Sequence, residues 1–310
     1  MNLFAERSCK AWTSTTSRKG NILMARNPKR TVTKSRRSMS QRLRSPASST
    51  QKTEPLPIRK ASEVNKPRSW VIYGRAGSGK TTLGGSFPGP ILLLDCKDEG
   101  TDSVSDIKDI DVMEIREWED IEHAYWWLVQ NPKRYKTLIV DTITQLQQVV
   151  VEEIGSKKAE KAGKAAGDWG TITKGEWGDI AARLKTWITN FRDLPMEVVF
   201  IAQDRVFNTN EEGSDDGMID PEVGPRLSPS VMSHLCAAVS VIGNTFVRTR
   251  TVKTKIKGRT REKEVTEYCL RLGPSASYIT KFRKPKRIAL PDFLIDPTYE
   301  EILETIKGEN

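Results

Sequence analysis

SWVIYGRAGSGKTT, residues 69–82, is the stretch of sequence that decides the fold. Its first five residues form a short apolar run, which predicts a buried strand, and a helix is expected to begin near Thr81. The glycine loop between them has the GxxxxGK[ST] spacing, in which backbone N–H groups turn inward to surround phosphate oxygens. The residues predicted to line this phosphate site are Gly74, Arg75, Ala76, Gly77, Ser78, Gly79, Lys80, Thr81 and Thr82.

A loop of this kind predicts two further contacts with a nucleoside triphosphate. Lys80 is expected to reach the β- and γ-phosphates, and the Thr81 hydroxyl is expected to ligate Mg²⁺. A P-loop also needs an acid at the tip of a neighbouring strand, and Asp141 ends the apolar run TLIVD. Asp141 is therefore predicted to act on Mg²⁺, although it could instead cap the helix that follows. The cofactors indicated are ATP and Mg²⁺.

Short apolar runs alternate with helical patterns after the loop. Such alternation predicts a parallel sheet that is covered on both faces, hence an α/β fold with a mostly parallel central sheet. Near the end of the chain the pattern changes to two long strands around a turn glycine, which predicts a C-terminal β-hairpin. The expected strands are 69–73, 91–95, 111–115, 137–141 and 197–203, and the expected helices are 118–130, 177–190 and 299–307. In the hairpin region the expected strands are 239–247, 248–256 and 264–272.

Several polar residues follow predicted strands, on the side where ligands bind in open parallel sheets. Asp95, Asp98 and Glu99 come after the run ILLLD, and Glu99 is our choice for the carboxylate that polarises the attacking water. Gln203 ends the run EVVFIAQ and could sense the γ-phosphate or could simply be a polar strand end. The predicted catalytic residues are Lys80, Glu99 and Gln203.

The charge of the 310-residue chain is uneven. Residues 1–66 hold 16 Lys and Arg against three Asp and Glu, a net charge of 16 − 3 = +13. The net charge of this segment exceeds the net charge of +10 of the whole chain. This Ser-, Arg- and Lys-rich segment predicts a disordered basic tail, followed by one ATP-binding domain at 67–310. The tail could attract nucleic acid, could be inert, or could be a mitochondrial targeting segment.

Other features narrow the class of protein. No apolar run approaches the length of a membrane span, and no secretory signal is evident, so we expect a protein of the cytoplasm. The four cysteines, Cys9, Cys96, Cys236 and Cys269, have neither disulfide-framework nor metal-ligand spacing. No NKxD guanine motif occurs, which argues against a GTPase.

The order of the P-loop, LLLDCKDEG, LIVDT and FIAQD resembles the RecA-type ATPase core. More specifically, the chain looks like the phage-encoded, core-only RecA-like proteins that promote single-strand annealing. DWG at 168–170 and KFR at 281–283 add to this resemblance, which covers about 67–307. It implies an ATPase that depends on single-stranded DNA, acts in the host cytoplasm, forms a ring or filament of identical subunits and has a single-strand-binding protein as partner.

The resemblance also implies roles for late residues. Lys281 and Arg283 would reach the nucleotide of the neighbouring subunit, unless they belong to an ordinary solvated basic run. Gln203 would couple the γ-phosphate to the DNA-binding loop after it. That loop, up to about residue 229, is acidic here, which makes it a poor binder of phosphates.

DNA contact is therefore expected on the basic hairpin. Alternate residues of a strand share a face, so lysines two residues apart form a charged stripe, although exposed lysines also protect sheet edges. The predicted DNA-binding residues are Arg248, Arg250, Lys253, Lys255 and Lys257.

Two functions of different classes remain open from the sequence. The first is a DNA-stimulated ATPase in recombination or annealing. The second is a nucleotide-gated binding or assembly module with little hydrolysis. A P-loop kinase is a third hypothesis. A kinase would require an arginine-rich lid, and the only basic segment late in the chain is predicted to form a hairpin instead, which makes this hypothesis weaker.

Overall fold

The computed structural model of the chain describes residues 58–60, 66–97, 100–165, 167–168, 170–208, 221–256, 259–284 and 287–308. The predicted tail 1–66 lies outside these ranges except for 58–60 and Lys66, and so do Asp98, Glu99 and Lys257. Within the described ranges, no helix is long and apolar enough to cross a membrane.

Nine strands of the described chain form one sheet, whose central path runs β11-β9-β8-β1-β5-β4-β2-β3, with β10 paired to β8. The six strands from β8 to β3 along this path are all parallel, whereas β9, β10 and β11 pair antiparallel with their neighbours. These strands are β1 Ser69–Gly74, β2 Ile91–Asp95, β3 Ile110–Glu114, β4 Thr137–Asp141, β5 Glu197–Ala202, β8 Val241–Ile256, β9 Arg259–Arg271, β10 Lys281–Phe282 and β11 Phe293–Ile295. The predicted α/β fold with a mostly parallel sheet is confirmed.

The helices divide between the two faces of the sheet because side chains alternate along each strand. Val71 and Tyr73 pack into a cluster with apolar residues of α2, α3, α4 and α5, whereas Trp70 and Ile72 pack on the other face with Leu83 of α1 and with α6. The helices are α1 Lys80–Gly85, α2 Trp118–Gln130, α3 Ile143–Lys161, α4 Lys174–Arg192, α5 Pro229–Ala238 and α6 Tyr299–Lys307, with the 3-10 helix η2 at Gly100–Val104. Both faces are therefore covered, as a parallel sheet of apolar strands requires.

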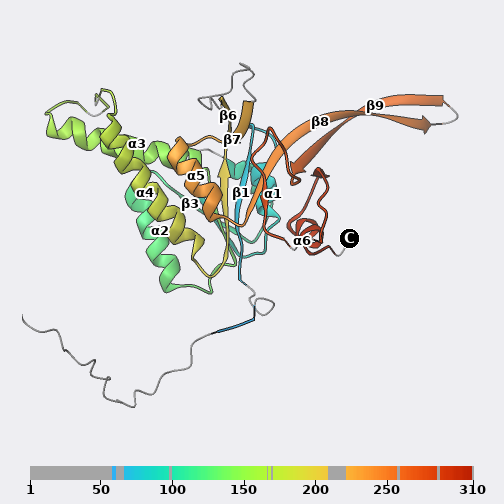
Figure 1. Cartoon of the computed structure of the whole chain (residues 1–310), viewed down its shortest axis with the longest axis horizontal. Helices are drawn as coiled ribbons and strands as arrows, with labels where there is room; N and C mark the ends of the chain where they lie inside the picture. The colour runs from blue at the N-terminus through green and yellow to red at the C-terminus, as the bar shows by residue number, and fades with distance from the viewer. Residues whose placement is uncertain are drawn as a thin grey trace, which may run out of the picture. The chain divides into compact units, whose positions relative to one another are not determined.

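After β5 the observed strands differ from the predicted ones in two places. The expected hairpin is present, but its first half is a single strand, β8, which pairs with β9 from Asn244 to Ile256. Beyond the sheet the two strands continue as a two-stranded arm (Figure 1). A small second sheet, β6 Asp204–Asn208 with β7 Pro221–Pro225, forms directly after β5 where no strand was predicted.

Candidate functional site: two pockets at the carboxyl ends of the strands

The glycine loop joins the carboxyl end of β1 to α1, and two of its glycines have left-handed backbone. Gly77 has φ 74° and Gly79 has φ 81°, which residues with a Cβ adopt only under strain. Gly74 is required for a different reason: there is no space for a side chain, since an added Cβ would lie 2.3 Å from the carbonyl oxygen of Thr245 on β8. The Ser78 hydroxyl further ties the loop to β8 by a bond of 2.7 Å to Thr245 Oγ1. The glycine spacing therefore reflects loop shape and strand packing together.

Lys80 is buried at the start of α1, with 8% of its surface exposed. Its Nζ donates to the carbonyl oxygen of Arg75 at 2.8 Å, so the ammonium group spans the mouth of the loop. A buried ammonium needs acceptors, and phosphate oxygens are the strongest acceptors that could enter here.

Thr81 and Asp141 meet at the loop. The Thr81 hydroxyl donates to Asp141 Oδ2 at 2.7 Å, and both groups are held in place by the helix α1 and the strand β4. Gly100 is next to this pair, because a Cβ on it would lie 3.3 Å from Asp141 Oδ2 and 3.5 Å from Thr81 Oγ1. Gly100 directly follows Glu99, the predicted catalytic acid, so the segment after β2 lies next to the Thr81–Asp141 pair. Glu99 itself lies outside the described residues.

The donor set fits a magnesium nucleotide. Mg²⁺ prefers hard oxygen ligands and keeps several waters and phosphate oxygens, so one hydroxyl and one nearby carboxylate suffice from the protein. In the described part of the chain, no group of three or more His, Cys, Asp and Glu side chains could hold a metal ion by itself. A cavity of about 610 Å³, the phosphate pocket, opens at Gly77–Leu83 and extends to β9 and to residues 296–298.

Gln203 follows β5 directly, two residues beyond the register partner of Asp141. Its backbone N–H donates to Thr144 Oγ1 at 3.1 Å, and Thr144 belongs to the first turn after Asp141. Its side-chain oxygen accepts from Arg226 Nη1 at 3.2 Å. Gln203 therefore connects the strand end beside the phosphate pocket to the segment that follows β7.

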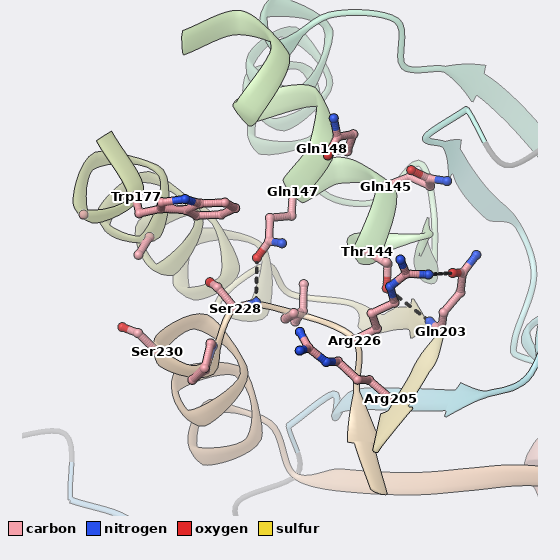
Figure 2. Close-up of a pocket in the computed structure, with 14 residues that line it drawn as sticks. Thr144, Gln145, Gln147, Gln148, Trp177, Gln203, Arg205, Arg226, Ser228 and Ser230 are labelled. Carbon is pink, nitrogen blue, oxygen red and sulfur yellow. Dashed lines mark hydrogen bonds between the residues drawn. The ribbon is translucent and has the colours of Figure 1, made fainter. Parts of the chain in front are cut away.

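A second cavity of about 800 Å³, the Gln203 pocket, lies beside these bonds (Figure 2). Arg205 and Arg226 line it, and both are exposed. Trp177 from the first turns of α4 lines its other side with 39% of its surface exposed. Gln147, also in the lining, accepts a bond of 2.9 Å from the Ser228 N–H at the start of α5, as Figure 2 shows. The pocket thus combines two cations, an open indole and several amides.

The predicted DNA-binding residues of the hairpin are engaged by glutamates of β9. Arg248 and Arg250 both contact Glu267, at 2.6 and 3.3 Å, and Lys253 contacts Glu262 at 3.2 Å. Strand alternation puts Lys253 on the opposite face from Arg248 and Arg250. The side chain of Lys255 and the whole of Lys257 lie outside the described residues.

Lys281 and Arg283 contact α5 of the same chain. Lys281 Nζ donates to the carbonyl oxygens of Cys236 and Ala237 at 2.7 and 3.0 Å, and Arg283 Nη2 donates to Ala237 at 3.3 Å. These bonds satisfy carbonyls at the C-terminal end of a helix, where cations are stabilising. Burial, followed by the charge of Arg283, lowers the pKa of Lys281.

Sequence reasoning missed residues that come from distant parts of the chain. Arg226 and Thr144 complete the surroundings of Gln203, and Tyr268 and Asp296 line the phosphate pocket. None of them belongs to a motif with fixed spacing. Arg205 and Arg226 did have one signal, since they are the cations of an otherwise acidic segment.

Comparison with known proteins gives one family match. No curated protein matches the chain. Among solved structures, a KaiC-like protein of the archaeon Pyrococcus horikoshii is similar at 11% identity and a TM-score of 0.36, over 75% of this chain and 90% of that one. The RadB recombinase is similar at 12% identity and a TM-score of 0.34, over 65% and 87%. A family model described as AAA domain matches residues 66–284, which hold the P-loop, Asp141 and Gln203, and the chain therefore belongs to the AAA domain family.

Proposed function

We propose that this chain is an ATPase whose turnover depends on single-stranded DNA and that it promotes annealing or recombination of DNA strands. The observation that carries the proposal is the adjacency of two sites at neighbouring strand ends. Thr81 bonds Asp141, and three residues later Thr144 bonds Gln203, which in turn bonds Arg226 in the Gln203 pocket. The sequence resemblance to phage-encoded, core-only RecA-like annealing proteins supports the same function.

The phosphate pocket is proposed to bind ATP with Mg²⁺. When bound, that pair supplies a phosphoryl group whose transfer to water releases free energy. Lys80 and the loop N–H groups hold the phosphate oxygens, Thr81 offers its hydroxyl to the metal, and Asp141 orients that hydroxyl. Glu99 is proposed to accept a proton from the attacking water, because its neighbour Gly100 adjoins the Thr81–Asp141 pair.

The Gln203 pocket is proposed to receive the DNA strand. An open indole such as Trp177 stacks on bases regardless of sequence, and Arg205 and Arg226 supply charges for phosphates. Gln203 is proposed to report the state of the phosphate pocket to this strand through Arg226. Arg248 and Arg250 on the hairpin remain proposed outer contacts, and their pairing with Glu267 makes each a weaker one.

The remaining expectations concern assembly. Lys281 and Arg283 are proposed to act on a neighbouring subunit's nucleotide in a ring or filament, which requires them to exchange their bonds to the α5 carbonyls. A single-strand-binding protein remains the proposed partner.

The test is phosphate release from ATP and Mg²⁺, with and without an oligothymidine, for the wild type and for Lys80→Ala. We expect release that rises with DNA and is lost in the variant. Absent release would contradict the ATPase proposal and leave a nucleotide-gated assembly module. Release that is indifferent to DNA would contradict the dependence on single-stranded DNA and the role in recombination.

A further inference from the structure

The phosphate pocket is larger than the loop that gives it its chemistry. Its volume of about 610 Å³ falls in the range of small-ligand sites, and its lining continues past Thr82 to Tyr268 on β9 and to Asp296 and Pro297 after β11. These three residues are far in sequence from any P-loop motif. The cavity therefore has lining residues of its own beside the glycine loop.

Tyr268 gives this part of the cavity an aromatic wall. Its ring lies against the glycine loop, since a Cβ added to Gly79 would be 3.3 Å from Tyr268 Cδ1. The neighbours Glu267 and Cys269 are buried, whereas 45% of Tyr268 is exposed, so the ring stands on the open side of β9. An aromatic side chain left open inside a cavity is a platform on which a planar ring can stack.

Asp296 is fixed to Tyr268 by two hydrogen bonds. Its N–H donates to the Tyr268 carbonyl oxygen at 2.6 Å, and its Oδ1 accepts from the Tyr268 N–H at 3.1 Å. The residue has a left-handed backbone, with φ 46°, and is followed by Pro297, which restricts the segment further. Within the part of the chain that the structure describes, Asp296 Oδ2 has no hydrogen-bond partner. A hydrogen-bond acceptor thus lies beside the aromatic wall in a fixed arrangement.

We propose that Tyr268 and Asp296 form the base subsite and that its ligand is an adenine base. The inference rests on the proposed function, because it assumes that the glycine loop binds the phosphates of a nucleoside triphosphate. The Tyr268 ring stacks on the base, and the Asp296 carboxylate accepts from an exocyclic amine. Adenine carries such an amine at position 6, whereas hypoxanthine has a carbonyl oxygen there, which the carboxylate repels, and carries no exocyclic amine. The glycine loop binds the triphosphate of any nucleoside, so this pair sets the preference for adenine over hypoxanthine.

The test is calorimetric titration at fixed free Mg²⁺ with three probes: ATP, inosine triphosphate and inorganic tripolyphosphate. Tyr268→Ala should weaken ATP binding roughly tenfold, the order of one lost aromatic stack, and leave tripolyphosphate within about twofold. Tyr268→Phe keeps the ring and should bind ATP like the wild type. Asp296→Asn keeps the acceptor for the Tyr268 N–H and adds an amide donor, so it should lower the preference for ATP over inosine triphosphate about tenfold.

The outcomes separate this inference from the function on which it rests. A wild type that binds neither ATP nor tripolyphosphate would overturn both. ATP binding that is unchanged in Tyr268→Ala would overturn the base subsite and leave the phosphate site standing. An equal loss of ATP and tripolyphosphate would also overturn it, because Tyr268 would then support the glycine loop and not the base.

Discussion

The two pockets at the carboxyl ends of the strands are built in different ways. Around the glycine loop the polar groups come from the P-loop motif and from Asp141 at the end of β4, and they already bind one another, as in the bonds Lys80–Arg75 and Thr81–Asp141. The Gln203 pocket takes its groups from α3, α4 and the segments after β5 and β7, and its arginines remain exposed. A motif and the end of an apolar strand therefore specify the phosphate-binding groups, whereas only the fold assembles the second pocket.

The largest effect is expected from the motif-built pocket. Replacing Lys80 by Ala removes the buried ammonium that is proposed to hold the phosphates, so nucleotide affinity should fall about 100-fold. Lys133→Ala, an exposed lysine before β4, is the matched control and should bind as the wild type does. Titration with a fluorescent ATP analogue measures both. Equal affinities of the two variants would break the assignment of this pocket.

The second pocket should respond to DNA and not to nucleotide. Trp177→Ala should reduce affinity for an oligothymidine about tenfold, and Arg226→Ala should also lower the salt dependence of binding by about one phosphate contact. Trp126→Ala is the control, because Trp126 is 57% exposed on α2, outside both pockets. Fluorescence anisotropy at several salt concentrations gives these values. An equal effect of Trp126→Ala would remove the reason to favour the Gln203 pocket.

The contrast also explains which parts could be predicted from the sequence. Apolar runs such as ILLLD and TLIVD became β2 and β4 with the predicted bounds, because burial on both faces demands continuous apolar sequence. Helix α2 also has its predicted bounds, since its apolar stripe has helical spacing. The pair β6 and β7 was missed, because its strands are polar and contact each other only through the fold.

The same reasoning applies to the candidate sites. The loop residues could be named from their spacing, and the structure brings Thr81 and Asp141 together as expected. The partners of Gln203 could not be named, because Arg226 and Thr144, 23 and 59 residues away, neither end an apolar strand nor belong to the P-loop motif. Asp141 could be named in spite of its distance from Thr81, because it ends an apolar strand.

The hairpin offers a smaller effect, which sharpens the comparison between the exposed arginines of the Gln203 pocket and the ion-paired cations of the hairpin. Arg250→Ala should weaken DNA binding only about twofold, because Glu267 already offsets part of the charge of that arginine. Lys133→Ala, which removes an exposed lysine outside the hairpin and both pockets, is its control and should have no effect. The same anisotropy assay measures both variants. A loss as large as that of Arg226→Ala would move the main DNA contact to the hairpin.

The smallest effect is expected at the other end of β5, far from both pockets along the strand. Glu197 accepts bonds from the Arg68 N–H and from Trp70 Nε1, and burial raises the pKa of its carboxyl. A raised native pKa means that this carboxyl favours the folded state at acid pH and that the benefit is lost as pH rises above the ordinary glutamate range of about 4.3.

Glu197→Gln tests this linkage. Its amide can accept only one of the two bonds, so the free energy of unfolding should fall about 1 kcal/mol at neutral pH. Its melting temperature should also decline less between mildly acid and neutral pH than that of the wild type. Thermal denaturation across pH measures both, and nucleotide and DNA affinities should stay unchanged. Parallel melting profiles would refute the proposed linkage.

The central claim is that the two pockets are coupled through Gln203. The most direct measurement is the affinity for a labelled oligothymidine with and without a non-hydrolysable ATP analogue, in the wild type and in Gln203→Ala. We predict that the analogue tightens DNA binding about tenfold in the wild type and leaves it unchanged in the variant, which should still bind each ligand alone. Equal tightening in both proteins, or none in the wild type, would contradict the account.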